Sequence, residues 1–372
     1  MSKARELAEL GAVYDSGALS NRNLIINGAM QVAQRGTAAH NEGNGYFSLD
    51  RWHQQKVNQD QFTYSVEQVS DGPSGFSKCL RVTTSTAETA LASDEFGRIY
   101  QPIEGQNLTR VGFGTADAKP LTVSFYVKSS ITGNFSCSLY LNDANVIYSQ
   151  AYTINAANTW EYKTLSIPAY TTAGPNLDNT QGAILNFGLF AGSGINTATT
   201  NWTSYTTAYL LGGQTANLAA TLNDSWRVTG VQLEVGTEAT PFEHRSFADE
   251  LVRCKRYFVR YGSDGSGSGE NYIPVTEFGA MQDNYRLRAN FLFDIEMRAS
   301  PSVTFSTLQV VNKALDVSND VTAVALAGQE YSRQAQSLLA STAPVGSQTA
   351  GQTGWARVKN SDSGYLFFDA EL

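Results

Sequence analysis

Hydrophobic and polar residues alternate with a period of two along much of the chain, which is typical of β-strands with one buried face. Three stretches show the pattern clearly, with same-face residues Leu121, Val123, Phe125 and Val127, then Phe135, Cys137, Leu139 and Leu141, then Ala183, Leu185, Phe187 and Leu189. Turn residues separate these stretches. The pattern therefore predicts an all-β protein whose residues 23–246 form an antiparallel jelly-roll β-sandwich.

The alternation also predicts the core. We expect it to contain Leu24, Ile26, Trp52, Val123, Phe125, Val127, Leu185, Phe187, Leu189, Trp226, Leu233 and Phe242. Within the strand expected at 226–235 the pattern changes phase at Gly230. A glycine at a change of phase indicates a β-bulge.

The first 22 residues predict a separate attachment or trimerisation segment. Residues 2–11 have the pattern of a short helix, with Leu7 and Leu10 on one face and Gly11 at its end. About ten residues form a marginal helix in isolation. We therefore expect this helix to pack on a partner or on its own copies, followed by an extended linker.

Residues 247–372 predict a second, smaller β-sandwich. Ser246 is placed to cap a turn of helix, and strand-like residues follow from Tyr257. The clearest strand runs from 286 to 298, with apolar side chains at every second position from Leu287 to Met297. The Gly-Ser run at 262–269 predicts a hairpin tip, and a terminal strand is expected near the C-terminus.

Composition and charge narrow the function. Only 16% of residues are charged and the formal net charge is −8. A dispersed acidic surface argues against binding nucleic acid or anionic membranes. No apolar stretch is long enough for a membrane helix and no signal peptide is visible, so we expect synthesis in a reducing cytosol and no membrane insertion. The three cysteines, Cys79, Cys137 and Cys254, have no metal-like spacing and are expected to be buried and unreactive.

Catalytic motifs are not found in the sequence. His40, His53 and His244 fit no metal-binding pattern, and no nucleophile elbow or phosphate loop is present. A glycosidase needs two facing carboxylates, and the pairs Asp94/Glu95 and Asp117/Glu104 remain as alternatives. We expect no enzymatic activity and no cofactor, and no acidic cluster demands a structural calcium ion.

Three aromatic residues are candidates for glycan contact. Trp160, Trp202 and Tyr205 lie in polar, turn-like surroundings rich in Asn and Thr. An aromatic ring can cover the apolar face of a sugar while neighbouring amides bond its hydroxyls. The alternative is that these rings belong to the core of the sandwich.

Several motifs resemble domains of bacteriophage tail fibres. Asn23–Gly36 (NLIINGAMQVAQRG) and Tyr46–Trp52 (YFSLDRW) resemble the opening of a jelly-roll domain common in these fibres. Val231–Gly236 (VQLEVG) and Ala239–Arg245 (ATPFEHR) resemble its end. Two later segments resemble the C-terminal domain that usually accompanies it, Leu251–Phe258 (LVRCKRYF) and Met297–Thr304 (MRASPSVT).

The resemblance implies a sandwich akin to carbohydrate-binding modules, in a homotrimeric appendage of a phage particle. Its expected partners are copies of itself, other virion proteins of the tail, baseplate or capsid, and polysaccharide on the host surface. The leading hypothesis is a non-enzymatic tail-fibre or receptor-binding subunit located in the virion. A capsid fibre or decoration protein with a purely structural role and a polysaccharide depolymerase are the alternatives.

Overall fold

The structure is a computed structural model that describes residues 21–37, 43–57, 62–262, 273–276, 279–312, 317–331, 333–342, 350–359 and 364–372. The chain divides into two compact units. The first extends to Glu250, except that Gln34–Gly36 belong to the second, which continues over Leu251–Leu372. The helix expected at residues 2–11 and most of the linker after it lie outside the described residues.

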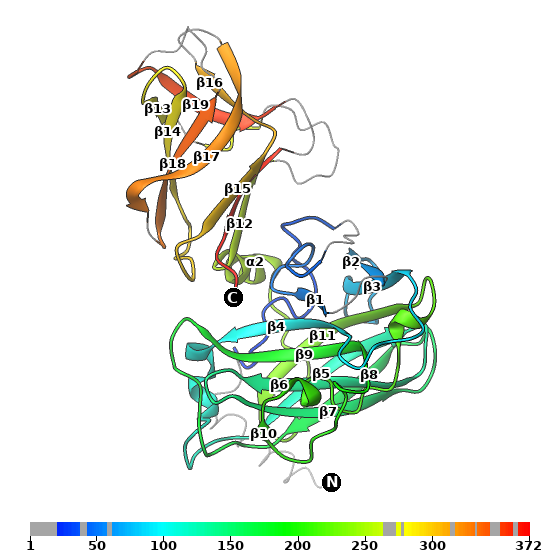
Figure 1. Ribbon diagram of the computed structural model, residues 1–372. Coiled ribbons are helices and arrows are strands. Elements are labelled where there is room, and N and C mark those ends of the chain that lie inside the picture. Colours follow the sequence, from blue (N-terminus) through cyan, green and yellow to red (C-terminus); the bar gives the residue numbers. More distant parts are fainter. Residues whose placement is uncertain are drawn as a thin grey trace. The chain divides into compact units, whose positions relative to one another are not determined.

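The first unit is a sandwich of two antiparallel sheets (Figure 1). The six-stranded sheet has the order β1 (His53–Val57), β4 (Phe96–Glu104), β9 (Gln181–Ala191), β6 (Gly133–Leu141), β7 (Val146–Ile154) and β10 (Thr203–Ser204). The five-stranded sheet has the order β2 (Thr63–Val69), β3 (Cys79–Thr86), β11 (Ser225–Val235), β5 (Leu121–Ser129) and β8 (Glu161–Ile167). From β4 onward the chain crosses repeatedly between the two sheets, which is the jelly-roll arrangement. The predicted all-β jelly-roll fold is confirmed.

The apolar faces of both sheets meet in one core. Phe187 on β9 packs against Phe125 on β5, with ring centroids 5.0 Å apart, and against Trp226 on β11 at 5.9 Å. The Trp226 indole is fully buried and donates a hydrogen bond to the Tyr152 hydroxyl at 3.1 Å. Of the core residues expected from the sequence, all but two are buried.

Ile26 is the first exception, because its segment does not alternate. Leu24 and Ile25 are both buried, and Ile26 is only half-buried. The Asn23 side-chain oxygen accepts the backbone N–H groups of Ile25 and Leu233, at 2.9 and 3.0 Å. This local turn breaks the period-two geometry on which the prediction relied.

Phe242 is the second exception, because the segment after β11 runs over the outer face of the five-stranded sheet. The half-buried Phe242 ring packs at 5.0 Å on Phe76, and the Phe76 ring covers Gly230. The register of β11 against β5 shifts between Thr229 and Gln232, so the bulge predicted at Gly230 is confirmed. Gly230 has φ +63°, and an added Cβ would lie 2.7 Å from the Phe76 ring, so only glycine fits there without strain.

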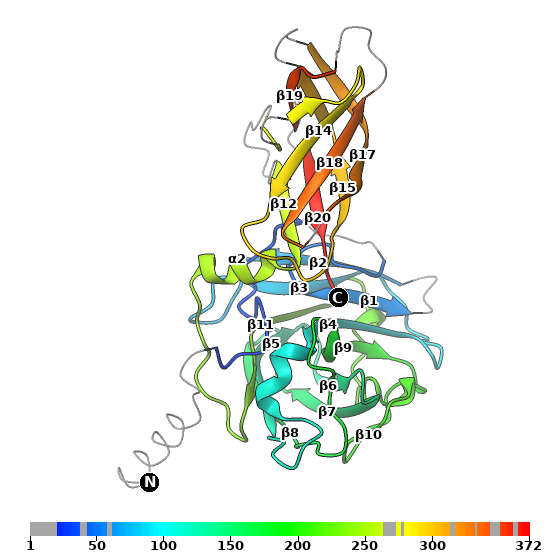
Figure 2. The same ribbon diagram turned by 90° about the vertical axis from the view of Figure 1, so that its left-hand side faces the viewer.

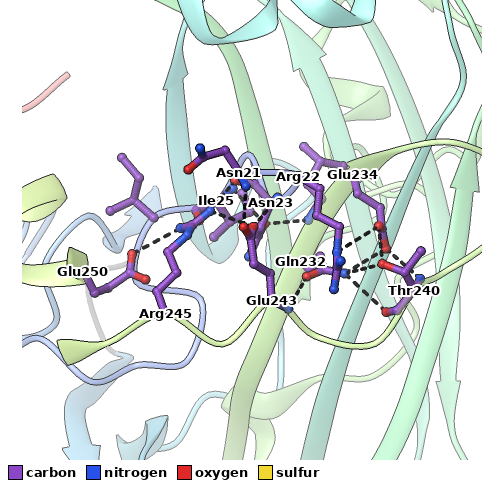
Figure 3. A network of polar contacts seen from close by, with 12 residues as sticks. Asn21, Arg22, Asn23, Ile25, Gln232, Glu234, Thr240, Glu243, Arg245 and Glu250 are labelled. Atoms are coloured by element: carbon purple, nitrogen blue, oxygen red, sulfur yellow. Dashed lines mark hydrogen bonds and ion pairs between the residues drawn. The ribbon is translucent and has the colours of Figure 1, made fainter. Parts of the chain in front are cut away.

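Residues near the start of the sandwich bind tightly to residues near its end (Figure 3). The Asn23 side chain donates to the Val231 carbonyl at 3.0 Å, and Arg245 donates to the Asn23 carbonyl at 2.7 Å. The Glu243 carboxylate accepts the backbone N–H of Asn23 at 2.8 Å and forms an ion pair with Arg245 at 3.1 Å. The opening and closing motifs of the sequence are therefore two halves of one polar clasp.

The second unit contains a three-stranded sheet and a closed barrel (Figure 2). The sheet has the order β12 (Phe258–Gly262), β20 (Tyr365–Asp369) and β15 (Ser302–Ser306). The barrel has the order β13 (Gly279–Met281), β14 (Arg286–Leu292), β18 (Ala335–Thr342), β17 (Val317–Tyr331), β16 (Leu308–Asn312) and β19 (Thr353–Val358). Residues from both sheets share one core, which includes Leu287, Phe291 and Phe368. The unit is all-β as expected, but it differs from the two open sheets of a sandwich because six of its strands close into a ring.

Local predictions for this region hold to different extents. The Ser246 hydroxyl accepts the backbone N–H of Asp249 at 3.2 Å and so caps α2 (Phe247–Lys255), as expected. Strand β14 ends at Leu292, earlier than the alternation suggested. Apart from Gly262, the glycine-rich run lies outside the described residues, and the strands on either side, β12 and β13, pair with other strands.

Helices are few in the described residues. Besides α2 there are three short 3-10 helices, η1 (Gly105–Val111), η2 (Thr207–Tyr209) and η3 (Leu218–Ala220). None of these helices has the length and apolar character needed to cross a bilayer. Cys79, Cys137 and Cys254 are buried free thiols, as predicted. Burial is the main cause that raises the pKa of Cys79 to about 11, which disfavours the reactive thiolate.

Candidate functional site

The three aromatic residues singled out in the sequence lie in different surroundings. Trp202 is half-buried and packs against the main core, with Phe113, Tyr148 and Tyr170 around its ring at 5.4–5.9 Å. Its indole N–H donates to the Pro168 carbonyl at 2.8 Å. Trp202 also lines a polar pocket of about 280 Å³ formed mainly by residues 198–203. Most of this ring is therefore occupied by packing at the edge of the sandwich.

Trp160 lies just before β8 of the five-stranded sheet. It is half-buried, and the Lys128 ammonium group lies 5.3 Å from its ring centroid. Within the described part of the chain its indole N–H is buried without a hydrogen-bond partner. The structure does not bring Trp160 together with the other two candidates.

Tyr205 belongs to a cluster on the outer face of the six-stranded sheet. Its ring packs on Tyr140 of β6, with centroids 4.4 Å apart. Asn145 holds both residues, because its carbonyl accepts the Tyr205 N–H at 2.9 Å and its side-chain oxygen accepts the Tyr140 hydroxyl at 3.1 Å. Of the three predicted residues, Tyr205 alone lies in the group of polar and aromatic side chains described next.

The pairing of β1, β4 and β9 places further side chains on this outer face. His53 is opposite Tyr100, and Tyr100 is opposite Asn186, so these residues form one row across three strands. Gln55 and Arg98 form the next row. The register of β4 against β9 shifts between Gly97 and Arg98, a bulge that sets the position of Arg98. Paired residues of adjacent strands point to the same face, so these side chains are neighbours.

Aromatic rings form a continuous series across β1 and its neighbour β4 on this face. Tyr46 contacts His53 edge-on at 4.8 Å, and His53 stacks on Tyr100 at 4.4 Å. The Arg98 guanidinium carbon lies 4.3 Å from the Tyr100 ring centroid. All four side chains are half-buried, so each combines contact with the protein and access to solvent.

Two amide side chains hold the Arg98 guanidinium. Its Nε donates to Gln55 Oε1 at 2.6 Å, and its Nη1 donates to Asn186 Oδ1 at 2.6 Å. Asn186 is fully buried and is fixed in turn by donation to the Ser138 hydroxyl at 3.1 Å. Burial lowers the pKa of Arg98, and the phenol groups of Tyr100 and Tyr205 partly oppose this effect. We call the residues Tyr46, His53, Gln55, Arg98, Tyr100, Tyr140, Asn186 and Tyr205 the Arg98 patch.

The other half of this face is covered by the chain itself. The segment after β9 packs a small apolar cluster, including Ile195, Leu210 and Leu211, over the strands. Ser138 donates to the Leu210 carbonyl at 2.8 Å, and Gln214 accepts the Ser136 N–H at 2.6 Å. The cover lies over β6 and β7 and reaches Phe96 of β4, whereas His53, Arg98 and Tyr100 on β1 and β4 stay half-exposed.

In the described part of the chain, the residues considered for catalysis or metal binding do not come together in a common site. Glu104 is buried and accepts a hydrogen bond from Gln106 at 2.5 Å, whereas Asp117 is exposed in a turn. The Glu95 carboxylate accepts the Ala92 N–H at 2.7 Å. No group of three His, Cys, Asp or Glu side chains suited to a metal ion occurs among the described residues.

Comparisons with known proteins add structural similarities at low identity. No family model matches the sequence, and no curated protein matches it. An enzymatically active domain of bacteriophage CBA120 tailspike protein 4 is similar over 58% of this chain and 22% of its own, with 12% identity and a TM-score of 0.31. A family 4 carbohydrate-binding module covers 56% of this chain and 98% of its own, with 13% identity and a TM-score of 0.29. The family 11 carbohydrate-binding module of a Clostridium thermocellum cellulase is similar over 55% of this chain and 99% of its own. Its identity is 12% and its TM-score is 0.27.

Sequence reasoning missed Arg98 and Tyr100, the centre of the patch. Their signal is present in the strand itself, where Arg98 and Tyr100 alternate with the buried Ile99 and Gln101. A polar face on one strand does not reveal which other strands lie beside it. The neighbours His53 and Asn186 come from positions far away in the sequence, so this signal alone could not define a site.

Proposed function

We propose that this protein is a non-catalytic, glycan-binding subunit of a bacteriophage tail fibre, and that the Arg98 patch contacts polysaccharide on the host surface. The observation that carries the proposal is the stacked series Tyr46–His53–Tyr100 beside the amides of Gln55 and Asn186. The phage origin and the location in the virion rest on the resemblance of the opening and closing motifs to tail-fibre domains.

The patch offers the two kinds of contact that sugars use. The half-buried rings of Tyr100 and His53 present apolar surface to the C–H groups of a pyranose. Arg98, and the hydroxyl groups of Tyr100 and Tyr205, supply hydrogen-bonding groups for its oxygens. His53, Arg98 and Tyr100 lie on the paired strands β1 and β4, so they are held in fixed relative positions before a ligand arrives.

A single site of this kind would bind weakly. Stacking one ring on a sugar contributes on the order of 1 kcal/mol, and a millimolar site corresponds to about −4 kcal/mol. Linking several sites raises the effective affinity by roughly 10²–10⁴. We therefore propose that the protein works as a homotrimer attached to other virion proteins. Light scattering that gave the mass of one chain, 40.3 kDa, under native conditions would contradict the trimer.

The glycan-binding role is tested by replacing Tyr100 with alanine. The full-length Tyr100→Ala variant should keep its native oligomeric mass and adsorb to host cells at least tenfold more weakly than wild type. Tyr162→Ala is the matched control, because Tyr162 is a 48% exposed tyrosine on the five-stranded sheet and should leave adsorption unchanged. If wild type itself does not adsorb, the purely structural role becomes the better hypothesis.

A further inference from the structure

Three basic side chains on the outer face of the five-stranded sheet have a carboxylate partner. On the five-stranded sheet Arg81 pairs with Glu67 at 2.7 Å, and Asp71 pairs with both Lys128 at 2.7 Å and Arg227 at 3.2 Å. Arg98 differs, because its partners in the described part of the chain are the neutral amides of Gln55 and Asn186. The half-buried guanidinium therefore has no opposite charge beside it among the described residues.

An unpaired cation at a half-buried position is unfavourable in the free protein. Removal of water from a charged group costs free energy unless an opposite charge or several hydrogen bonds compensate. The ionisable groups that act electrostatically on Arg98 are Tyr100 and Tyr205, and no carboxylate is among them. Asp143 acts on Tyr140 but not on Arg98. A ligand that brought a negative charge would remove this cost.

The geometry leaves part of the guanidinium available for such a ligand. The bonds to Gln55 and Asn186 use Nε and one N–H of Nη1, and Nη2 has no hydrogen-bond partner among the described residues. Arg98 is half-buried, so part of its side chain stays open to solvent. The two amides fix the plane of the guanidinium, and a planar guanidinium matches a carboxylate well.

We propose that the Arg98 patch recognises an acidic polysaccharide, with the carboxylate of a sugar acid on Arg98 and its ring against Tyr100. This inference rests on the proposed glycan-binding function and specifies its ligand class. The chain carries a formal net charge of −8, so the protein as a whole does not attract polyanions. Recognition of the acid must then come from this local contact, because exposed charges are screened beyond about 8 Å at physiological ionic strength.

The test uses an array of purified bacterial surface polysaccharides, both acidic and neutral, probed with the full-length protein. Each acidic polymer is also printed after chemical reduction of its carboxylates to hydroxymethyl groups, which keeps the sugar backbone and removes the charge. Wild type should bind acidic polymers and lose at least tenfold in binding when they are reduced. Wild type should not bind a polymer whose only acidic groups are phosphate or sulfate.

Two arginine variants make the test specific. Arg98→Gln should bind acidic polymers at least tenfold more weakly than wild type, and Arg98→Lys should fall between them because it keeps the charge without the planar fork. Arg81→Gln is the control, since it makes the same change on the opposite face. Thermal unfolding checks that each variant is folded, and carboxylate reduction tests the same contact without altering the protein.

The outcomes separate the two proposals. If wild type binds only neutral polymers, or binds acidic and reduced polymers equally, the acidic-ligand inference is wrong and the glycan-binding function stands. Binding of wild type that requires phosphate or sulfate also overturns the carboxylate assignment. If wild type binds no polymer on the array and does not adsorb to host cells, the glycan-binding function fails, and the inference fails with it.

Discussion

The two outer faces of the sandwich differ in the partners of their basic side chains. On the five-stranded sheet Arg81, Lys128 and Arg227 have carboxylates within 2.7–3.2 Å. On the six-stranded sheet Arg98 is held by two amides and stacked on Tyr100. Paired surface charges contribute little to stability, and each charge is already compensated by its partner. A guanidinium held by neutral groups keeps its charge available, which is why we propose the six-stranded sheet as the face for an anionic partner.

The largest expected effect concerns the core on which both faces rest. Trp226→Ala removes a fully buried indole that packs on Phe187, and should lower the free energy of unfolding by about 3–5 kcal/mol. Chemical denaturation measures this change. Tyr162→Ala, an exposed residue on the five-stranded sheet, should change stability much less. A loss near zero for Trp226→Ala would mean that the two sheets do not share the core described here.

The second effect concerns buried charge that is paired. Arg245→Met removes the cation between Glu243 and Glu250, at 3.1 and 3.5 Å, in the clasp that joins the two ends of the sandwich (Figure 3). Breaking a buried pair leaves carboxylates without compensation, so we expect a loss of about 3 kcal/mol in unfolding free energy. Arg98→Gln should destabilise the protein far less, since no carboxylate among the described residues depends on Arg98. Equal losses in the two variants would contradict the comparison.

A smaller effect is expected where the paired charges are exposed. Asp71→Asn removes the carboxylate shared by Lys128 and Arg227, but the Asp71 side chain is 44% exposed. We expect a change in stability of less than about 1 kcal/mol, measured by thermal unfolding. Binding to the polysaccharide array should be unchanged. If Asp71→Asn weakened binding as much as Arg98→Gln does, the five-stranded sheet would also be a binding face.

The smallest effect depends on pH. Burial alone would raise the pKa of Glu161, but hydrogen bonds from Lys163, Ala156 and Asn155 outweigh it and lower the pKa to about 2. A lowered pKa in the folded state stabilises the protein above the unfolded-state value of 4.5, and this stabilisation is lost as the pH falls toward 2. Glu161→Gln should therefore be less stable than wild type at pH 7, by less than about 1 kcal/mol. Denaturation at pH 7 and near pH 2 checks this, and a difference that persisted at pH 2 would contradict it.

Local chemistry made parts of the fold predictable from the sequence. The alternation that placed Val123 and Phe125 in the core holds, as do the bulge at Gly230 and the cap at Ser246. Each of these features depends on residues close together in the chain. The predictions for Ile26 and Phe242 were wrong, because side-chain hydrogen bonds and the course of the chain after β11 outweighed the alternation.

For the candidate site, the sequence predicted the types of residue but not which residues come together. The sequence suggested exposed aromatics beside amides, and Tyr205 does lie in such a group. Trp202 and Trp160 lie elsewhere, because a polar neighbourhood in sequence does not reveal what packs against a ring in space. Arg98 could not be singled out, since its lack of a carboxylate partner is a property of the folded surface.

The sequence by itself determined the all-β class, the strands and the residues that face the core, because the period of a strand is a local property of the chain. The tertiary structure decided which strands became neighbours, which half of the six-stranded sheet the chain covers, and that six strands of the second unit close into a barrel. Strand pairing joins segments such as β1, β4 and β9 that are separated by many residues, and no local pattern specifies such partners. The centre of the Arg98 patch, with His53, Tyr100 and Asn186 in one row, exists only because these three strands lie side by side.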